Sequence, residues 1–314
     1  MTSSKTTLPH QSPDLFLTDG GLETTLVFLQ GFDLPYFAAF DLLKDEKGYN
    51  AIRNYYRRYL EIAKNAKTGF ILESPTWRAN PDWINKIGYP KPAVKEINKK
   101  SIQLLVDLKR EFENEISTII ISGCVGPRGD GYKAENKMTV KDAQNYHAEQ
   151  IESFSETEVD MISAITMNYV EEAVGIVRAA NAVHLPVVIS FTVETNGKLP
   201  EGTSLKDAIE QVDKSVNEPP IYFMINCAHP THFQSELKGN EQWVKRIKGI
   251  RANASCKTHA ELDESVELDR GNPKELAREY KKMKDKLSQL NVFGGCCGTD
   301  EEHVFEIIKH IKAG

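Results

Sequence analysis

The 314-residue sequence predicts an α/β fold, a single (β/α)8 TIM barrel, on the strength of two patterns. Eight short and nearly uninterrupted apolar runs, which are typical of strands buried on both faces, alternate with long amphipathic segments. Strict alternation implies a parallel sheet, and eight repeats in a chain of this length imply a closed barrel. The alternative is an open doubly wound sheet, but no GxGxxG motif follows the first apolar run.

The expected elements follow one another along the chain. The strands are residues 15–19, 69–74, 117–125, 159–166, 186–193, 221–226, 249–255 and 291–295. Helical patterns cover, among others, residues 51–66, 92–113, 139–156 and 272–290, and a last helix over 300–312 follows the final strand. Thr139 and the pair Asn272 and Pro273 have the residue types that begin helices.

Composition excludes several classes of partner. The net charge is −6 and the sequence has no basic tract, which argues against nucleic acid and anionic membranes. No apolar run approaches the roughly 20 residues that a membrane-spanning helix needs. Residues 1–14 are polar, so they are predicted to be a flexible tail rather than a secretory signal, and residues 15–314 to be one barrel domain. Five cysteines are too few for a disulfide framework, so we expect a cytoplasmic protein with reduced thiols.

Three cysteines stand at the ends of expected strands. Cys227 ends the sixth strand, and the neighbours Cys296 and Cys297 end the eighth. Alternate strands of a barrel feed the same interior layer, so these ends should meet over the barrel mouth. Adjacent residues of a regular strand point to opposite faces, but the surrounding glycines let the backbone turn both sulfurs inward. Three convergent thiols predict a zinc site with one open position for chemistry.

Other interpretations of these cysteines stay open at this stage. Cys227 alone could be a small buried apolar residue, and the adjacent pair could be a redox switch. Cys124 and Cys256 lack a neighbouring thiol and are predicted to be packing residues.

The sequence resembles the homocysteine S-methyltransferase family of thiol-methylating barrels in five motifs that occur in the family's order. They are LTDGGLETTL (17–26), SGCVGPRGDGY (122–132), VVISFTVETNGKLPEGTSLKDAI (187–209), INCAHP (225–230) and GGCCGTDEEH (294–303). The resemblance covers nearly the whole chain from about residue 15. It implies that Cys227, Cys296 and Cys297 bind Zn²⁺, and that His229 and His232 are not needed as ligands.

The resemblance also implies an activity. The protein is expected to be an S-methyltransferase of methionine biosynthesis that moves a methyl group from a small sulfonium or ammonium donor to a zinc-bound thiol, homocysteine above all. Its partners are then small molecules, a thiol acceptor and a methyl donor. The sequence leaves open whether the protein forms a homo-oligomer. No protein nucleophile is expected, because zinc deprotonates the thiol that attacks the methyl group. The alternatives are methylation of a different thiol and a non-catalytic zinc-binding barrel.

Several residues are candidates for substrate contact. Asp19 and Gly20 match the family's substrate-contacting pair, although Asp19 could instead cap the next helix. Asn226 matches the family's asparagine and could orient the ligand loop, bind the amino-acid backbone or make a turn. Glu23 is predicted to cap a helix. Trp77 and Trp83 could hold a methylated cation by cation–π contact or simply pack together.

One position departs from the family pattern. Family members carry a glutamate late in the fourth strand, associated with the amino group of homocysteine, and alignment places Ile165 there. An isoleucine cannot neutralise a buried ammonium, which is costly to leave unpaired. Glu73 ends the second strand, and even-numbered strands share a layer, so Glu73 could supply the carboxylate. Otherwise Glu73 is a solvated or capping residue, and the acceptor is a thiol without that amino group.

Overall fold

The eight expected strands form a closed barrel in the computed structural model, which describes residues 6–238, 241–265 and 267–313. Neighbouring strands run parallel, and the first pairs with the last, with Phe16 opposite Val292. The strands are β1 (Phe16–Leu17), β2 (Gly69–Glu73), β3 (Ile119–Val125), β4 (Met161–Met167), β5 (Val187–Phe191), β6 (Tyr222–Asn226), β7 (Ile247–Ala252) and β8 (Val292–Gly295). The single TIM barrel is confirmed, and the strand boundaries differ from the prediction by only a few residues.

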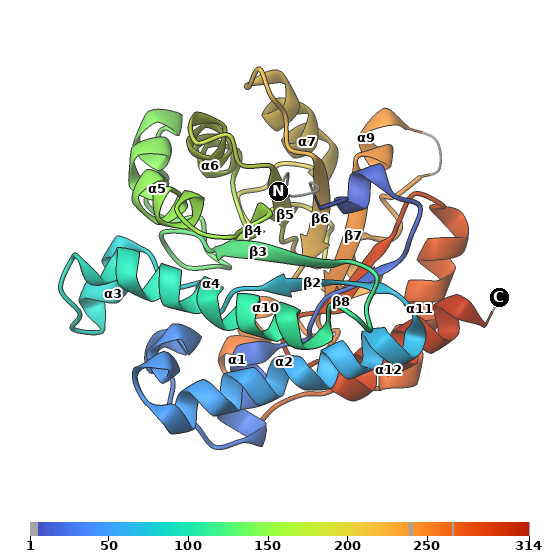
Figure 1. Ribbon diagram of the computed structural model, residues 1–314. Coiled ribbons are helices and arrows are strands. Elements are labelled where there is room, and N and C mark those ends of the chain that lie inside the picture. Colours follow the sequence, from blue (N-terminus) through green and yellow to red (C-terminus); the bar gives the residue numbers. More distant parts are fainter. Residues whose placement is uncertain (1–5, 239–240, 266, 314) are drawn as a thin grey trace.

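Helices surround the barrel on its outer side (Figure 1). The long ones are α2 (Glu46–Ala66), α4 (Ala93–Phe112), α5 (Val140–Ser155), α6 (Val170–Ala182), α7 (Leu205–Lys214), α11 (Pro273–Lys286) and α12 (Glu301–Lys312). Short helices lie on the connections: α1 (Leu22–Thr24), α3 (Pro81–Lys86), α8 (Pro230–Phe233), α9 (Gln242–Lys245) and α10 (His259–Asp263). Helix α12 packs beside α2, so the ring of helices closes as the sheet does (Figure 1). No helix among the described residues has the length and apolar character that a membrane crossing requires.

The predicted helix starts are confirmed. The Thr139 side chain accepts a hydrogen bond from the backbone N–H of Asp142 at 3.2 Å and so caps α5. Asn272 caps α11 in the same way, and Pro273 occupies its first position. In each case the cap satisfies a backbone donor that the first helical turn leaves without a partner.

The N-terminal end of the barrel is packed with apolar side chains and covered by the segment before β1. Leu8 is buried in the cluster that fills the barrel interior. The Asn291 side chain donates hydrogen bonds to the carbonyl oxygens of Pro9, Ser12 and Asp14 at 2.8, 3.1 and 3.1 Å. Residues 1–5 of the predicted tail lie outside the described residues, and the division into a tail of 1–14 and a domain of 15–314 stays a prediction.

Candidate metal centre and substrate cavity

Three cysteine sulfurs meet at the C-terminal end of the barrel. Cys227 directly follows β6, and Cys296 and Cys297 directly follow β8. Cys227 and Cys296 are joined as a disulfide pair, contrary to the expectation that all thiols are reduced, so the metal would bind their reduced form. Sγ of Cys297 lies 3.9 Å from Sγ of Cys227, and all three sulfurs lie within 4.8 Å of one another. In the described part of the chain, no other set of three His, Cys, Asp or Glu side chains is close enough to share a metal ion. The two sulfurs that pair are those of Cys227 and Cys296. The redox alternative instead paired the neighbours Cys296 and Cys297.

The backbone next to the sulfurs is left-handed. Cys227 has φ of 52° and Gly298 has φ of 78°. A non-glycine residue with such a φ is uncommon and is held there by its surroundings. Gly294 and Gly295 play a different part from the one expected. Both belong to β8, and a Cβ on either would collide with the side chains of Thr18 and Thr299, so close packing explains these two glycines.

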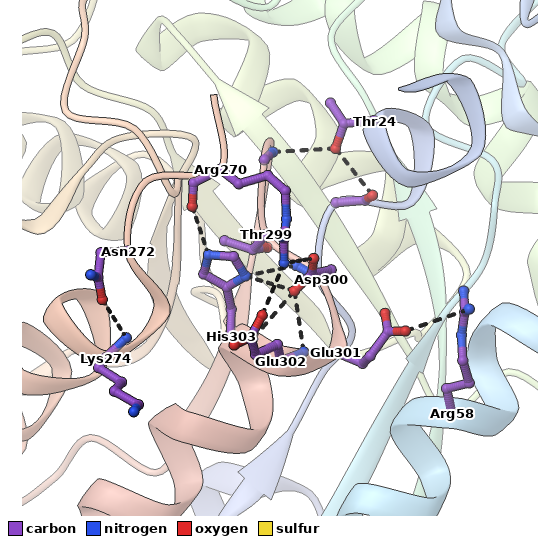
Figure 2. A network of polar contacts seen from close by, with 12 residues as sticks. Thr24, Arg58, Arg270, Asn272, Lys274, Thr299, Asp300, Glu301, Glu302 and His303 are labelled. Atoms are coloured by element: carbon purple, nitrogen blue, oxygen red, sulfur yellow. Dashed lines mark hydrogen bonds and ion pairs between the residues drawn. The ribbon is translucent and has the colours of Figure 1, made fainter. Parts of the chain in front are cut away.

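A polar network supports the turn that carries Cys296 and Cys297. Asp300 caps α12 by accepting hydrogen bonds from backbone N–H groups of its first turn, and its carboxylate also contacts the side chains of His303 and Arg270 (Figure 2). Nε2 of His303 donates to the carbonyl oxygen of Arg270 at 2.9 Å. These contacts fasten the segment before α11 to the start of α12.

Helix α1 rests on the same turn. The backbone N–H of Gly298 donates to the Thr24 hydroxyl at 3.2 Å, a contact visible in Figure 2. The backbone N–H of Gly21 donates to the carbonyl oxygen of Thr299 at 3.0 Å. A Cβ on Gly20 would lie 2.8 Å from the same oxygen, so only glycine fits there. The Asp-Gly-Gly motif and the Gly-Cys-Cys-Gly-Thr motif therefore form one packed unit.

Asn226 holds a bulge in β4. The pairing of β4 with β5 shifts register between Ala164 and Met167, and Thr166 has φ of 66°. The Asn226 side chain accepts from the backbone N–H of Thr166 at 3.0 Å and donates to its hydroxyl at 2.8 Å. A bulge of this kind re-aims the neighbouring side chains. The amide of Asn226 is fully buried and bonds to Thr166, and its predicted role in orienting the ligand loop or binding substrate stays a prediction.

Two aromatic residues that the sequence analysis missed contact the cysteines. The Tyr132 hydroxyl lies 3.6 Å from Sγ of Cys297. The Tyr132 ring stacks on the His259 ring with 4.0 Å between centroids. Nε2 of His259 lies 2.7 Å from the carbonyl oxygen of Cys227, within hydrogen-bonding distance. Tyr132 ends the motif at residues 122–132 and His259 follows Cys256 by three residues, but nothing in the sequence places either one against Cys227 or Cys297.

A cavity of about 440 Å³ opens beside the three sulfurs, a size typical of small-molecule sites. Its polar lining includes Asp19, Gly20, Glu23, Glu73, Arg78, Asp130 and Arg251 together with the three cysteines. Its apolar lining includes Phe28, Phe37, Trp77 and Ile165. The cavity therefore joins the candidate metal ligands to both Ile165, which departs from the family pattern, and Glu73, the candidate replacement carboxylate.

A buried arginine links two carboxylates in the cavity. Nη2 of Arg251, in β7, donates to Oδ1 of Asp19 at 2.6 Å, and Nη1 lies 3.8 Å from Oε1 of Glu73. The Tyr55 hydroxyl donates to the other oxygen of Asp19 at 3.1 Å. Burial acts to lower the pKa of Arg251, but Asp19 and Glu73 raise it above its usual range. Asp19 is therefore paired with Arg251 and does not cap a helix.

Glu73 is a buried carboxylate without a hydrogen-bond partner. It is 4% exposed, and neither of its carboxylate oxygens accepts a hydrogen bond within the described residues, although Arg251 lies 3.8 Å away. The nearby hydroxyls of Ser122 and Ser163 bond to each other at 2.8 Å. Burial raises the pKa of Glu73 to about 7, although Arg251 opposes the shift. A buried carboxylate that lacks partners is costly, and a ligand that supplies a donor would remove that cost.

The rings of Trp77 and Trp83 hold a cation from the protein itself. The guanidinium carbon of Arg78 lies 4.0 Å from the ring centroid of Trp77 and 3.9 Å from that of Trp83. Nη1 of Arg78 donates to the carbonyl oxygen of Gly129 at 2.8 Å. Arg78 thus ties the connection after β2 to the one after β3, and the pair of tryptophans is occupied.

Other predictions about single residues have mixed outcomes. Cys124 is buried, as predicted, but Cys256 is exposed, so its assignment to packing is wrong. His232 contacts the carbonyl oxygen of Cys256, and His229 contacts Thr231. Glu23 does not cap a helix: the N-cap of α1 is Gly21, and Glu23 follows in the first turn and lines the cavity.

Comparisons with known proteins agree with this geometry. A family model described as homocysteine S-methyltransferase matches residues 16–311. The chain is 22% identical to homocysteine S-methyltransferase 1 of Arabidopsis thaliana and 21% identical to that of Brassica oleracea var. italica, in each case over 94% of this chain and 93% of the relative. The metallated homocysteine methyltransferase MmuM from Escherichia coli superposes with a TM-score of 0.73 at 18% identity, over 94% of this chain and 96% of that one. This structural likeness shows the fold.

Proposed function

Because the chain belongs to the homocysteine S-methyltransferase family, we propose that it transfers a methyl group from a small sulfonium or ammonium donor to a thiol activated by zinc at Cys227, Cys296 and Cys297. Homocysteine, which would become methionine, is the acceptor that the family favours. The observation that carries the proposal is the convergence of three sulfurs from β6 and β8 on the wall of one cavity.

The donor set suits zinc. Thiolates are soft ligands that select zinc among the common divalent ions, and three protein ligands leave a fourth position for a substrate. Zinc bound there would deprotonate an acceptor thiol and hold it as a nucleophilic thiolate. The left-handed turn at Cys227 and the network around Asp300 fix the three sulfurs before any ligand arrives.

The remaining protein groups orient the substrates. In the proposed step, the acceptor sulfur forms a bond to the methyl carbon while the carbon–sulfur or carbon–nitrogen bond of the donor breaks, and the bonding pair stays with the donor. This displacement needs no protein nucleophile and no proton transfer from the protein. Its rate depends on holding the two substrates in line, which a preformed cavity accomplishes.

We further propose that Glu73 binds the amino group of the acceptor. Ile165 lines the cavity with an apolar side chain, and Asp19 is already paired with Arg251. Glu73 is the buried carboxylate of this cavity whose two oxygens lack hydrogen-bond partners within the described residues. An ammonium placed against Glu73 would satisfy it. The alternative is an acceptor thiol without an amino group.

Removal of the metal should abolish turnover. We expect freshly purified protein to contain about one zinc ion per chain and to lose methyl transfer on treatment with a chelator. Activity should return with added zinc. Metal analysis paired with a homocysteine methylation assay checks this, with S-methylmethionine and betaine as alternative donors. Full turnover by metal-free protein would contradict the proposal.

Glu73→Gln should weaken binding of the acceptor thiol and leave binding of the methyl donor unchanged. An ammonium–carboxylate hydrogen bond is worth about 1.5–3 kcal/mol, so we expect kcat/KM for homocysteine to fall by roughly tenfold to a hundredfold. The ratio of wild type to variant should increase with pH through about 7, since the raised pKa leaves Glu73 partly protonated below that value and only the ionised form pairs with an ammonium. Steady-state kinetics between about pH 6 and about pH 8 measure this ratio.

The matched control for this experiment is Glu152→Gln, an exposed glutamate on the outer helix α5. It should leave the kinetics for both substrates unchanged. If Glu73→Gln has the same kcat/KM for homocysteine as wild type, Glu73 does not bind the acceptor. If wild type ignores homocysteine but methylates a thiol without an amino group, the alternative acceptor is favoured.

A further inference from the structure

Glu23 occupies a place in the cavity that the proposed acceptor site does not use. It lies in α1, which rests through Thr24 on the turn carrying Cys296 and Cys297 (Figure 2). Its side chain lines the cavity, its own backbone N–H donates to the carboxylate, and Asp19, Arg251 and Arg78 are close enough to affect its charge. Burial raises the pKa of Glu23 to about 7, with Asp19 acting in the same direction and Arg251 and Arg78 opposing it. Glu23 is therefore a carboxylate that gains by meeting a cation.

Two partly exposed aromatic rings line the same cavity as Glu23. Phe28 and Phe37 line the cavity, yet they are 39% and 44% exposed. Phe37 and its neighbour Tyr36 have φ of 58° and 54°. Left-handed backbone at a bulky residue costs on the order of 1–3 kcal/mol and is concentrated at ligand clamps. The loop thus keeps the Phe37 ring at the cavity mouth despite this cost.

We propose that Glu23 is the counter-ion for the cationic methyl donor and that the rings of Phe28 and Phe37 form the wall against which the methylated cation lies. Aromatic faces attract sulfonium and quaternary ammonium groups, and a carboxylate beside them adds a full negative charge. Sulfonium is the class of donor that fits best, because the thioether left after transfer stays neutral, whereas the tertiary amine left by an ammonium donor takes up a proton and becomes cationic again. This inference rests on the proposed function and assigns a residue that the sequence predicts to be a helix cap rather than a substrate contact.

The charge change during transfer determines what Glu23 does. The sulfonium becomes a neutral thioether as the methyl group moves to the acceptor sulfur, and Glu23 itself gives up no proton. Its attraction for the donor is strongest before transfer and disappears afterward. Glu23 therefore favours donor binding and product release but adds nothing to the transition state beyond what it gives the bound donor.

Glu23→Gln is the test of this assignment. We expect KM for S-methylmethionine to increase by roughly tenfold, with kcat equal to or above that of wild type and the KM for the acceptor within about twofold, because the lost contact is strongest in the ground state. Glu23→Asp keeps the charge on a shorter side chain, so its KM for S-methylmethionine should lie between those of wild type and Glu23→Gln. Calorimetric titration of the zinc-loaded protein with S-methylmethionine, without acceptor, measures the same loss without turnover. Glu152→Gln should bind the donor as wild type does.

The outcomes separate this inference from the proposed function. Wild type that methylates a thiol, together with a Glu23→Gln variant of unchanged donor affinity, overturns the Glu23 assignment alone. A variant with weaker acceptor binding and normal donor binding also overturns it, since Glu23 then serves the other substrate. Wild type that neither binds nor uses any sulfonium or ammonium donor overturns both proposals.

Discussion

Cys297→Ser is expected to leave a folded barrel that neither holds zinc nor transfers a methyl group. A thiol with a pKa of about 8.5 is only a few per cent thiolate at pH 7, and loss of its fixed position costs roughly another hundredfold, so activity should fall by about a thousandfold or more. Cys227→Ser and Cys296→Ser should behave in the same way, because the three sulfurs form one cluster. Metal content, methyl transfer and circular dichroism of each purified variant measure the three parts of this expectation.

Cys256→Ser is the matched control for these variants. Cys256 is exposed and is not part of the sulfur cluster, so its replacement should preserve zinc content and activity. The barrel should fold in all four variants, because the sulfurs lie at the mouth, whereas the buried apolar side chains lie inside the barrel and under the helices. A Cys297→Ser protein that retains zinc and turnover would contradict the assignment. Unfolding of all three cluster variants would instead indicate a structural metal.

The barrel and its cysteine cluster were within reach of sequence reasoning for simple physical reasons. Strands buried on both faces must be continuously apolar, so the runs were visible without any partner information. The rule that alternate strands share a layer then placed the end of β6 near the end of β8, and the structure brings Cys227 and Cys296 together there. These inferences needed only local pattern and topology.

The rest of the site depends on contacts between distant residues. The sequence predicts Arg251 only as part of a strand, and its partner Asp19, 232 residues away, explains why a buried strand carries a guanidinium. An arginine within an apolar run was the one available signal. The bulge at Thr166 depends on the amide of Asn226 from another strand, which no local pattern reports. The sequence predicts Glu23 as a cap, since its position in the cavity wall depends on the packing of α1 against Gly298, which is far away along the chain.

Arg251→Leu should be the most destabilising single change at the cavity. The substitution leaves Asp19, which is 3% exposed, and Glu73, which is 4% exposed, without their cation. Removing one partner of a buried ion pair costs about 3–5 kcal/mol, because the remaining charge stays buried without compensation. Urea denaturation of wild type and variant measures this difference in the free energy of unfolding.

The deficit of Arg251→Leu should depend on pH in a defined direction. Burial raises the pKa of Asp19 and Glu73 above their unfolded values, that of Glu73 to about 7, and loss of Arg251 raises both further. A carboxyl whose folded pKa is raised contributes stability at acid pH that is lost as pH rises through the folded pKa. The free energy of unfolding of the variant should therefore be closest to that of wild type at about pH 5, and the difference should be largest above about pH 7.

A compensated variant decides whether the stranded charges cause this loss. Asp19→Asn and Glu73→Gln, introduced together with Arg251→Leu, remove both carboxylates and should restore much of the stability and flatten its dependence on pH. Arg251→Lys keeps a positive charge but loses the planar fork that reaches Asp19 and the carbonyl oxygen of Gly295 at once, so it should lie between wild type and Arg251→Leu. If the triple variant is no more stable than Arg251→Leu, and neither depends on pH, the loss comes from packing at β7. The charges of Asp19 and Glu73 would then not be what holds Arg251 in place.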